Sequence, residues 1–284
     1  MDQQKIIYYS DVMSDDFAGT DIRTVRVGRD FPYRHRSVLW NAAAFLLYYL
    51  VAFPLVWIIS KFYLGMRFKN RRVLRSLKHC GFYLYGNHTR DLDAFLPSMA
   101  AYPKKAYIIA NPDAVSLPGL KQVVQMLGTI PIPTEYGGMR PFMDAVFSRV
   151  REKNCVAIFP EAHVWPFYNG IRPFPDTSFH YPVKDRAPVV AMVTTYRKRK
   201  GLFAFAKKPG MTVTFSEPMA ADPGLPPKEA QKELRDRVYR FMCETSAAGE
   251  NIVYIDYRPA GNVMPTARAG EQNGPEKTKG KKQA

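Results

Sequence analysis

Cysteine is scarce in this chain of 284 residues, which has only three, far apart and without Cys-x-x-Cys spacing: Cys80, Cys155 and Cys243. This pattern supports neither a disulfide framework nor a thiolate zinc site, so we expect a reducing compartment. Four catalytic signatures are also missing from the sequence: the GxSxG elbow, the GxxxxGK[ST] phosphate loop, GxGxxG and HExxH. The sequence therefore gives no motif evidence for an elbow-type serine hydrolase or a Walker ATPase.

Acidic residues are few relative to basic ones. The 41 Lys and Arg residues against 25 Asp and Glu give a net charge of +16. Such an excess favours anionic partners, namely membranes, nucleic acids or acidic proteins. Nucleic acid is the least favoured of these, because no nucleic-acid fold motif is present and the basic residues cluster beside an apolar run.

The one long apolar run, residues 38–59, is broken only by Asn41 and Pro54. As a helix it is long enough to reach across bilayer hydrocarbon. Two arginines precede it, and seven cations without an acid follow it between residues 61 and 78. Positive charge on both flanks conflicts with a single crossing, whereas a helix that bends at Pro54 and dips into one leaflet satisfies both ends. A buried pair of core helices is the alternative.

After residue 80, short apolar runs alternate with amphipathic stretches, which is typical of an α/β domain. We expect strands at 82–86, 106–110, 129–133, 156–159, 189–194 and 211–215, and helices at 91–101, 117–127, 141–153 and 227–245. The predicted fold is α/β, with a mixed central sheet flanked by helices and an N-terminal membrane-associated helical segment. Its expected parts are a polar leader (1–36), an apolar and basic helical anchor (37–79), the α/β domain (80–260) and a disordered basic tail (261–284).

A histidine and an aspartate five positions apart, His88 and Asp93, follow the strand expected at 82–86. Spacing alone is weak evidence, since the pair His180 and Asp185 has it in a proline-rich stretch without such a strand. A loop leaving a strand, however, is where α/β folds expose reactive groups. If the chain turns so that they meet, Asp93 can hold one ring nitrogen of His88 while the other accepts a proton from a substrate hydroxyl. The alternative is an N-capping aspartate beside an incidental histidine.

A second expected strand, 156–159, is followed by Pro160 and Glu161. The segments NHTRDLD and IFPEA, in this order, resemble the first and third blocks (NHx4D and F-P-E-G) of the glycerolipid acyltransferase family, that of 1-acylglycerol-3-phosphate acyltransferases. Residues 117–132 and 187–190 are similar to its second and fourth blocks. The resemblance covers roughly residues 82–215.

The resemblance implies a membrane-associated enzyme of phospholipid biosynthesis at the cytoplasmic face of the cell membrane. His88 and Asp93 are then expected to activate an acceptor hydroxyl, which attacks an acyl thioester of coenzyme A or acyl carrier protein. The implied acceptor is a lysophospholipid such as 1-acylglycerol-3-phosphate, and neither a bound cofactor nor a metal is expected. The implied substrate-binding residues are Asn87, Arg90, Gly128, Thr129, Pro160, Glu161, Ala162 and His163.

The sequence departs from the family pattern at three cations. Pro133-Thr134 stands where an arginine usually follows the second block, Ala162-His163-Val164 replaces Gly-Thr-Arg, and no lysine lies near Asn111. Those cations are thought to hold the acceptor phosphate, and neither Thr nor Val can make a charge-assisted bond to it. Either other cations substitute for them or the acceptor differs. The candidate substitutes are Arg90, Lys121, Arg140, Arg172 and Arg197.

Two alternatives to an acyltransferase with a phosphate-bearing acceptor therefore stay open. His163 and Trp165 could form a flatter, less charged acceptor pocket for an acyltransferase whose acceptor carries no phosphate. The chain could also be a non-catalytic basic protein that binds a membrane surface or nucleic acid.

Overall fold

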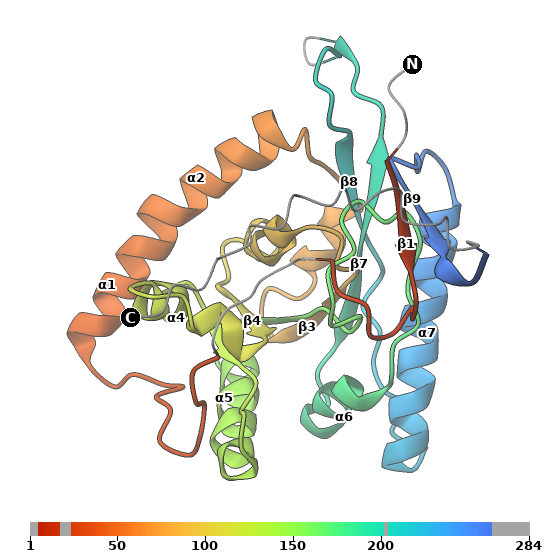
Figure 1. The fold of residues 1–284 in the computed structure, drawn as a ribbon. Coiled ribbons are helices and arrows are strands. Elements are labelled where there is room, and N and C mark those ends of the chain that lie inside the picture. The colour runs from red at the N-terminus through yellow and green to blue at the C-terminus, as the bar shows by residue number, and fades with distance from the viewer. Residues whose placement is uncertain (1–4, 18–23, 202–203, 263–284) are drawn as a thin grey trace, which may run out of the picture.

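A seven-stranded mixed sheet forms the centre of the molecule in the computed structural model, which describes residues 5–17, 24–201 and 204–262 (Figure 1). Its strand order is β2-β8-β7-β3-β6-β4-β5, and every neighbouring pair is parallel except β7 and β8. The strands are β2 (Arg67–Lys69), β3 (Phe82–Gly86), β4 (Ala106–Ala110), β5 (Thr129–Pro131), β6 (Cys155–Ile158), β7 (Val189–Arg197) and β8 (Gly210–Phe215). The predicted α/β fold with a mixed sheet is confirmed.

Alternating side chains of the central strand β3 face two separate cores. Tyr83 and Tyr85 pack on the side covered by α5 (Met139–Arg151), α6 (His180–Asp185) and α7 (Pro227–Ala247). Phe82 and Leu84 pack on the side covered by α3 (Leu96–Ala101) and by the N-terminal apolar helix. Burial on both faces is expected of a central parallel strand, and it fixes the position of the residues that follow β3.

The apolar run forms one continuous helix, Val38–Tyr63, which is long and apolar enough to cross a membrane. It consists of α1 (Val38–Leu46), a π-helical segment (Leu47–Ala52), which is a wide turn, α2 (Phe53–Ile58) and a second such wide turn (Ile59–Tyr63). The helix continues through Pro54, directly after the first wide turn, where π-type hydrogen bonding accommodates the missing N–H. Only 17% of its most apolar 18-residue stretch is buried in the protein. The helix is therefore not one of a buried pair of core helices.

One face of this helix is nevertheless fixed to the domain (Figure 1). The Tyr48 hydroxyl accepts the N–H of Ala106 at the start of β4 (3.0 Å), and the Tyr49 hydroxyl donates to the carbonyl of Pro103 (2.9 Å). Further along, the ring of Phe53 stacks on that of Tyr102 at 4.4 Å. The helix therefore lies along the domain, and its other face exposes Val38, Leu39, Phe45, Leu46, Leu50, Val51, Leu55, Ile58 and Phe62.

Several elements differ from the sequence expectation. The basic segment after the apolar helix forms β2 and a 3₁₀ helix (Arg71–Arg75) rather than a continuous helix. The helix expected at 91–101 divides into a 3₁₀ helix (Asp91–Phe95) and α3, because the chain must turn after β3, and that expected at 117–127 is the shorter α4 (Lys121–Met126). Of the expected basic tail, residues 263–284 lie outside the described part of the chain.

The leader contributes structure to the domain. Its strand β1 (Lys5–Tyr9) pairs in parallel with β9 (Ile255–Pro259), close to the other end of the chain. This two-stranded sheet was not predicted, since neither segment has a partner nearby in sequence. The described parts of residues 1–36 thus pack against the α/β domain.

We predict that Tyr48→Phe destabilises the protein by roughly 1–3 kcal/mol, because it leaves the buried N–H of Ala106 without an acceptor. Tyr49→Phe is the matched control, and it should cost less because the Tyr49 hydroxyl is exposed where it meets Pro103. Denaturant unfolding in a mild detergent measures both. Equal losses for the two variants would contradict the role given to Tyr48.

Candidate active site

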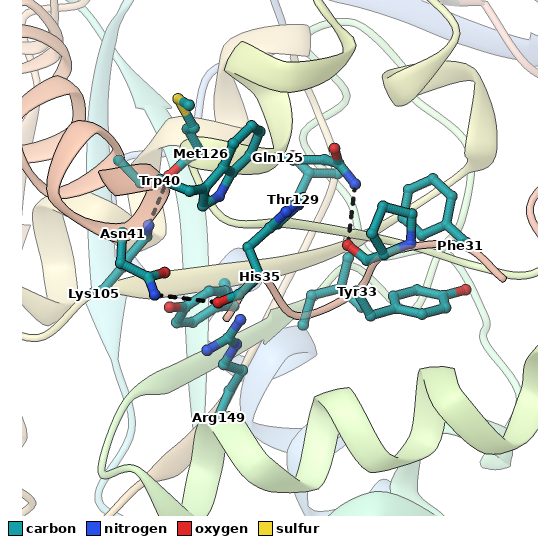
Figure 2. A pocket seen from close by; sticks show the side chains of 14 residues that line it. Phe31, Tyr33, His35, Trp40, Asn41, Lys105, Gln125, Met126, Thr129 and Arg149 are labelled. Carbon is teal, nitrogen blue, oxygen red and sulfur yellow. Dashed lines mark hydrogen bonds between the residues drawn. The ribbon is translucent and has the colours of Figure 1, made fainter. Parts of the chain in front are cut away.

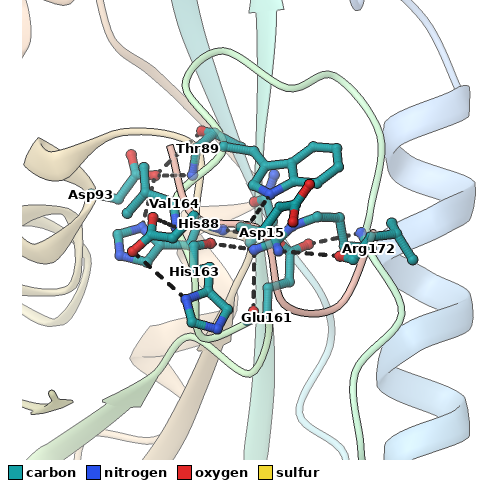
Figure 3. A network of polar contacts seen from close by, with 12 residues as sticks. Asp15, His88, Thr89, Asp93, Glu161, His163, Val164 and Arg172 are labelled. Atoms are coloured by element: carbon teal, nitrogen blue, oxygen red, sulfur yellow. Dashed lines mark hydrogen bonds and ion pairs between the residues drawn. The ribbon is translucent and has the colours of Figure 1, made fainter. Parts of the chain in front are cut away.

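His88 and Asp93 meet at the carboxyl end of β3. The Nδ1 atom of His88 lies 3.6 Å from Oδ2 of Asp93, and the Asp93 side chain is fully buried while 17% of the His88 side chain is exposed (Figure 3). The imidazole stacks on the ring of Phe159, with the ring centroids 4.7 Å apart. Gly86 leaves room for that ring, since a Cβ there would lie 2.9 Å from the Phe159 edge. The predicted encounter of His88 and Asp93 is thus present in the structure.

Hydrogen bonds hold Asp93 in place beneath the histidine. Its Oδ2 atom accepts the backbone N–H groups of Thr89 (2.6 Å) and Arg90 (2.8 Å) and the Thr89 hydroxyl (3.3 Å). The Tyr196 hydroxyl from β7 donates in turn to the Thr89 hydroxyl at 2.7 Å. Because 3.6 Å exceeds hydrogen-bond length, His88 and Asp93 are within ion-pair range but do not form a hydrogen bond.

Glu161, at the end of β6, reaches the same loop from the neighbouring strand. Its Oε2 atom accepts the backbone N–H of His88 (3.2 Å), and its Oε1 atom accepts that of Arg172 (3.1 Å). The Arg172 guanidinium lies 3.6 Å from Oε2, and both side chains are 1% exposed. The carboxylate is therefore occupied by backbone and guanidinium groups, and it positions the loop that carries His88.

Arg172, which the sequence offered only as a candidate substitute cation, connects three segments of the chain. Besides the Glu161 carboxylate, its guanidinium donates to the backbone carbonyls of Glu161 (3.1 Å), His163 and Val12 (3.4 Å). Burial lowers the pKa of Arg172, and the Glu161 carboxylate opposes that shift. A guanidinium held in this way is unavailable to an acceptor phosphate.

The leader covers the loop that follows Glu161. The indole N–H of Trp165 donates to the carbonyl of Asp15 (2.7 Å), and the backbone N–H of Val164 donates to the Asp16 carboxylate (3.3 Å). The Trp165 ring stacks on Tyr257 of β9 at 4.9 Å and contacts Tyr9 of β1 at 4.8 Å. The backbone N–H of Trp165 donates to the carbonyl of His88 (3.3 Å), so this aromatic cluster adjoins the loop that carries His88.

The remaining implied substrate-binding residues have different surroundings. The Asn87 amide is buried and exchanges hydrogen bonds with the backbone of Thr194 (3.0 and 2.8 Å). The Arg90 guanidinium lies over the ring of Phe167, 4.7 Å from its centroid. The His163 ring is half-buried with Nδ1 3.7 Å from an Asp16 oxygen. Pro160 and Ala162 flank Glu161, whereas Gly128 and Thr129 lie at the start of β5, away from the strand end that leads to His88.

An apolar cavity of about 240 Å³ lies between the N-terminal helix and the sheet. Ala94 and Phe95, directly after Asp93 in the chain, form part of its wall. Its other lining residues include Phe53 and Val56 of α2, Ile108 of β4, Leu127 and Thr129. The segment that carries Asp93 thus borders a hydrophobic space.

A smaller and more polar pocket of about 50 Å³ lies where the leader meets β5 and α5 (Figure 2). His35 stacks on Trp40 at 3.8 Å, and Asn41 donates to the His35 carbonyl at 3.1 Å. Burial and the nearby Arg149 lower the pKa of His35. Neither His88 nor Asp93 lines this pocket, so it belongs to the packing of the leader. Among the described residues, no group of three or more His, Cys, Asp or Glu side chains could hold a metal ion.

Comparison with known proteins decides the family. The profile of the acyltransferase family matches residues 68–213, which include both His88 and Glu161 and make up more than half of the sequence. The chain belongs to the acyltransferase family. The resemblance inferred from the NHTRDLD and IFPEA segments is confirmed at that level.

A similar solved structure is that of the 1-acyl-sn-glycerophosphate (LPA) acyltransferase, PlsC, from Thermotoga maritima. The match has 15% sequence identity and a TM-score of 0.49, and it covers 76% of this chain and 98% of the other. Among curated proteins, no significant match to this acyltransferase was found.

We predict that Ala162→Gly stabilises the protein by roughly 0.5–1 kcal/mol. Ala162 has a φ of +65°, where a side chain is strained and glycine is not. Ala248→Gly, at a φ of −84°, is the matched control and should destabilise by a similar amount, because only the unfolded chain gains freedom there. Thermal unfolding measures both variants. Changes of the melting temperature with the same sign in the two variants would contradict the claim that the backbone of Ala162 is strained.

We predict a pH-dependent stability that arises from Glu161. Burial raises the pKa of its carboxyl from 4.5 to about 7, although Arg172 and two backbone N–H groups oppose the shift. The folded protein then binds a proton that the unfolded chain releases, so the contribution of this group to the free energy of unfolding falls as the pH rises from about 4.5 to about 7. The free energy of unfolding of the wild type minus that of Glu161→Gln, measured in urea, should therefore fall between about pH 4.5 and about pH 7. Glu229→Gln, which removes a carboxylate at an exposed position, is the matched control, and a pH-independent difference for Glu161→Gln would contradict the prediction.

Proposed function

We propose that this acyltransferase moves a fatty acyl group from a thioester of coenzyme A or acyl carrier protein to an acceptor hydroxyl, with His88 as the general base. The observation that carries the proposal is the buried Asp93 carboxylate 3.6 Å from Nδ1 of a partly exposed His88. With Nδ1 turned toward Asp93, the Nε2 atom is left to accept the hydroxyl proton, and Asp93 stabilises the imidazolium that forms. As the hydroxyl oxygen attacks the thioester carbonyl, the C–S bond breaks, and the departing thiolate takes the proton back from Nε2 of His88.

The apolar cavity supports a fatty acyl substrate. Its wall includes Ala94 and Phe95, the two residues that follow Asp93, so an acyl chain in the cavity would have its reacting end near the catalytic pair. The other wall is the apolar helix Val38–Tyr63, whose exposed face supports association with the membrane in which such chains reside. The basic flanks of the helix support the cytoplasmic face of the cell membrane as its location.

The acceptor that we propose first is a lysophospholipid such as 1-acylglycerol-3-phosphate. A second candidate, an acceptor without a phosphate, is favoured by the charges next to the catalytic loop. Where the family usually has an arginine, Val164 donates its N–H to the Asp16 carboxylate, and Arg172 is engaged with Glu161. A carboxylate in that position repels a phosphate dianion.

We predict that His88→Ala lowers the rate of acyl transfer by roughly 10²–10⁴-fold, because no general base remains. Asp93→Asn should lower it by a similar factor, since an amide cannot stabilise the imidazolium. His79→Ala and Asp144→Asn are matched controls at exposed positions and should keep wild-type rates. The assay follows the release of free thiol from labelled acyl-CoA and acyl carrier protein, with thermal unfolding as the check of folding. A folded His88→Ala protein with undiminished transfer would refute the mechanism.

The same assay identifies the acceptor. Purified protein in lipid–detergent micelles is offered 1-acylglycerol-3-phosphate, lysolipids with other headgroups, and hydroxylated or amine-bearing compounds without phosphate. Fastest transfer to 1-acylglycerol-3-phosphate supports the first candidate, and transfer only to uncharged or cationic acceptors supports the second. No transfer to any acceptor, with His88 and the fold intact, would favour a non-catalytic role.

A further inference from the structure

The loop between β7 and β8 carries a dense group of cations with no acid nearby in sequence. No Asp or Glu occurs from residue 186 to residue 216. The structure describes residues 198–201 and 204–209 of this connection, which we call the basic loop, and its cations are Lys198, Arg199, Lys200, Lys207 and Lys208. In Figure 1 the hairpin projects beyond the rest of the sheet, at the top of the view.

Several side chains of the basic loop face solvent. Phe205 is 80% exposed, and Lys198, Lys200 and Lys207 are exposed as well. Among the residues that the structure describes, none of these three lysines has an ion-pair partner. Glu250 does approach the loop, but it accepts the backbone N–H of Lys198 (3.3 Å) rather than the amine.

The basic loop is fixed to the end of the apolar helix. The Arg199 guanidinium donates to the carbonyls of Phe62 (3.3 Å) and Tyr63, among the last residues of that helix, and to the carbonyl of Lys208 (2.9 Å). The Lys208 amine donates to the Tyr63 hydroxyl at 2.9 Å. Phe62 and Tyr63 are themselves about half exposed. The loop and the helix end therefore form one continuous surface, apolar along the helix and cationic at the loop.

We propose that the basic loop is a second membrane-contact site, at which its lysines bind anionic phospholipid headgroups and Phe205 enters the interfacial region. Aromatic side chains at the level of the headgroups with flanking cations are the pattern of interfacial segments, and each cation near an anionic surface adds attraction. An acidic protein such as an acyl carrier protein would also attract the lysines. The lipid is favoured because the Phe205 ring is 80% exposed and because the loop is hydrogen-bonded to the helix that offers the larger apolar face.

This site goes beyond acyl transfer, and it constrains the orientation of the enzyme. Since Arg199 and Lys208 hold the loop against Tyr63, headgroup contact by the loop puts the carboxyl end of the helix at the membrane surface. Together with the contacts of Tyr48 and Tyr49 along the domain, this arrangement has the helix lying in the interface instead of crossing the bilayer.

The first test is a charge-matched comparison of vesicle binding. Replacing Lys198, Lys200 and Lys207 by Gln should lower the apparent affinity for vesicles rich in phosphatidylglycerol by about tenfold or more. It should leave the weaker binding to pure phosphatidylcholine vesicles unchanged. The control removes the same charge from exposed positions of α7, with Lys228, Lys232 and Arg240 replaced by Gln. Flotation of the full-length protein, diluted from detergent into vesicles, measures both.

The second test locates position 205 directly. A polarity-sensitive fluorophore is attached to Phe205→Cys in a Cys80→Ser, Cys243→Ser background, in which only the buried Cys155 remains. Anionic vesicles should shift its emission to the blue and allow quenching by lipid-linked spin labels, whereas a probe at Lys228→Cys should show neither effect.

Two outcomes would overturn the proposal. One is equal loss of vesicle binding by the loop and α7 variants, which would mean that net charge alone matters. The other is unchanged vesicle binding by the loop variant together with loss of transfer only from acyl carrier protein, which would assign the loop to an acidic protein. Neither outcome depends on the identity of the acyl acceptor, so failure here is distinguishable from failure of the proposed reaction.

Discussion

The parallel pairing of β3 with β6 is the constraint on which the site depends. Their register runs from Phe82 opposite Cys155 to Tyr85 opposite Ile158. Because parallel strands end at the same edge of a sheet, the residues that follow each strand emerge side by side. This brings the backbone N–H of His88 to the carboxylate of Glu161, 73 positions further along the chain. A slip by one residue would turn the buried side chains of both strands to the wrong faces.

The buried pair of Glu161 and Arg172 extends this constraint to the leader. Two charges this deeply buried are costly unless hydrogen bonds satisfy them, and here backbone N–H groups and carbonyls do so. One of those carbonyls belongs to Val12, so the leader supplies a hydrogen-bond acceptor to the Arg172 guanidinium. Val12 and Asp15 of the leader therefore hydrogen-bond to Arg172 and Trp165 of the α/β domain.

The local parts of the site could be predicted from the sequence, and the distant ones could not. An apolar strand, a turn and a His-x4-Asp spacing lie within a dozen residues, so the contact of His88 with Asp93 follows from local geometry. The role of Arg172 depends on segments far apart in the chain, and an isolated arginine in a loop gives no signal of burial. The pairing of β1 with β9 joins segments about 250 residues apart in the chain, and neither strand has the length or alternation that would indicate its partner.

The apolar helix serves two purposes that cannot be separated by deleting it. Its exposed face is available to a membrane, while Phe53 and Val56 on its other side form a wall of the apolar cavity. The same side supplies the Tyr48 hydroxyl that accepts the first N–H of β4. A chain without residues 38–63 would lose the exposed apolar face, the cavity wall and part of the support of the sheet together. Loss of activity in such a deletion would therefore say nothing about anchoring, and only substitutions on the exposed face, such as Leu50 or Leu55 to polar residues, isolate that contribution.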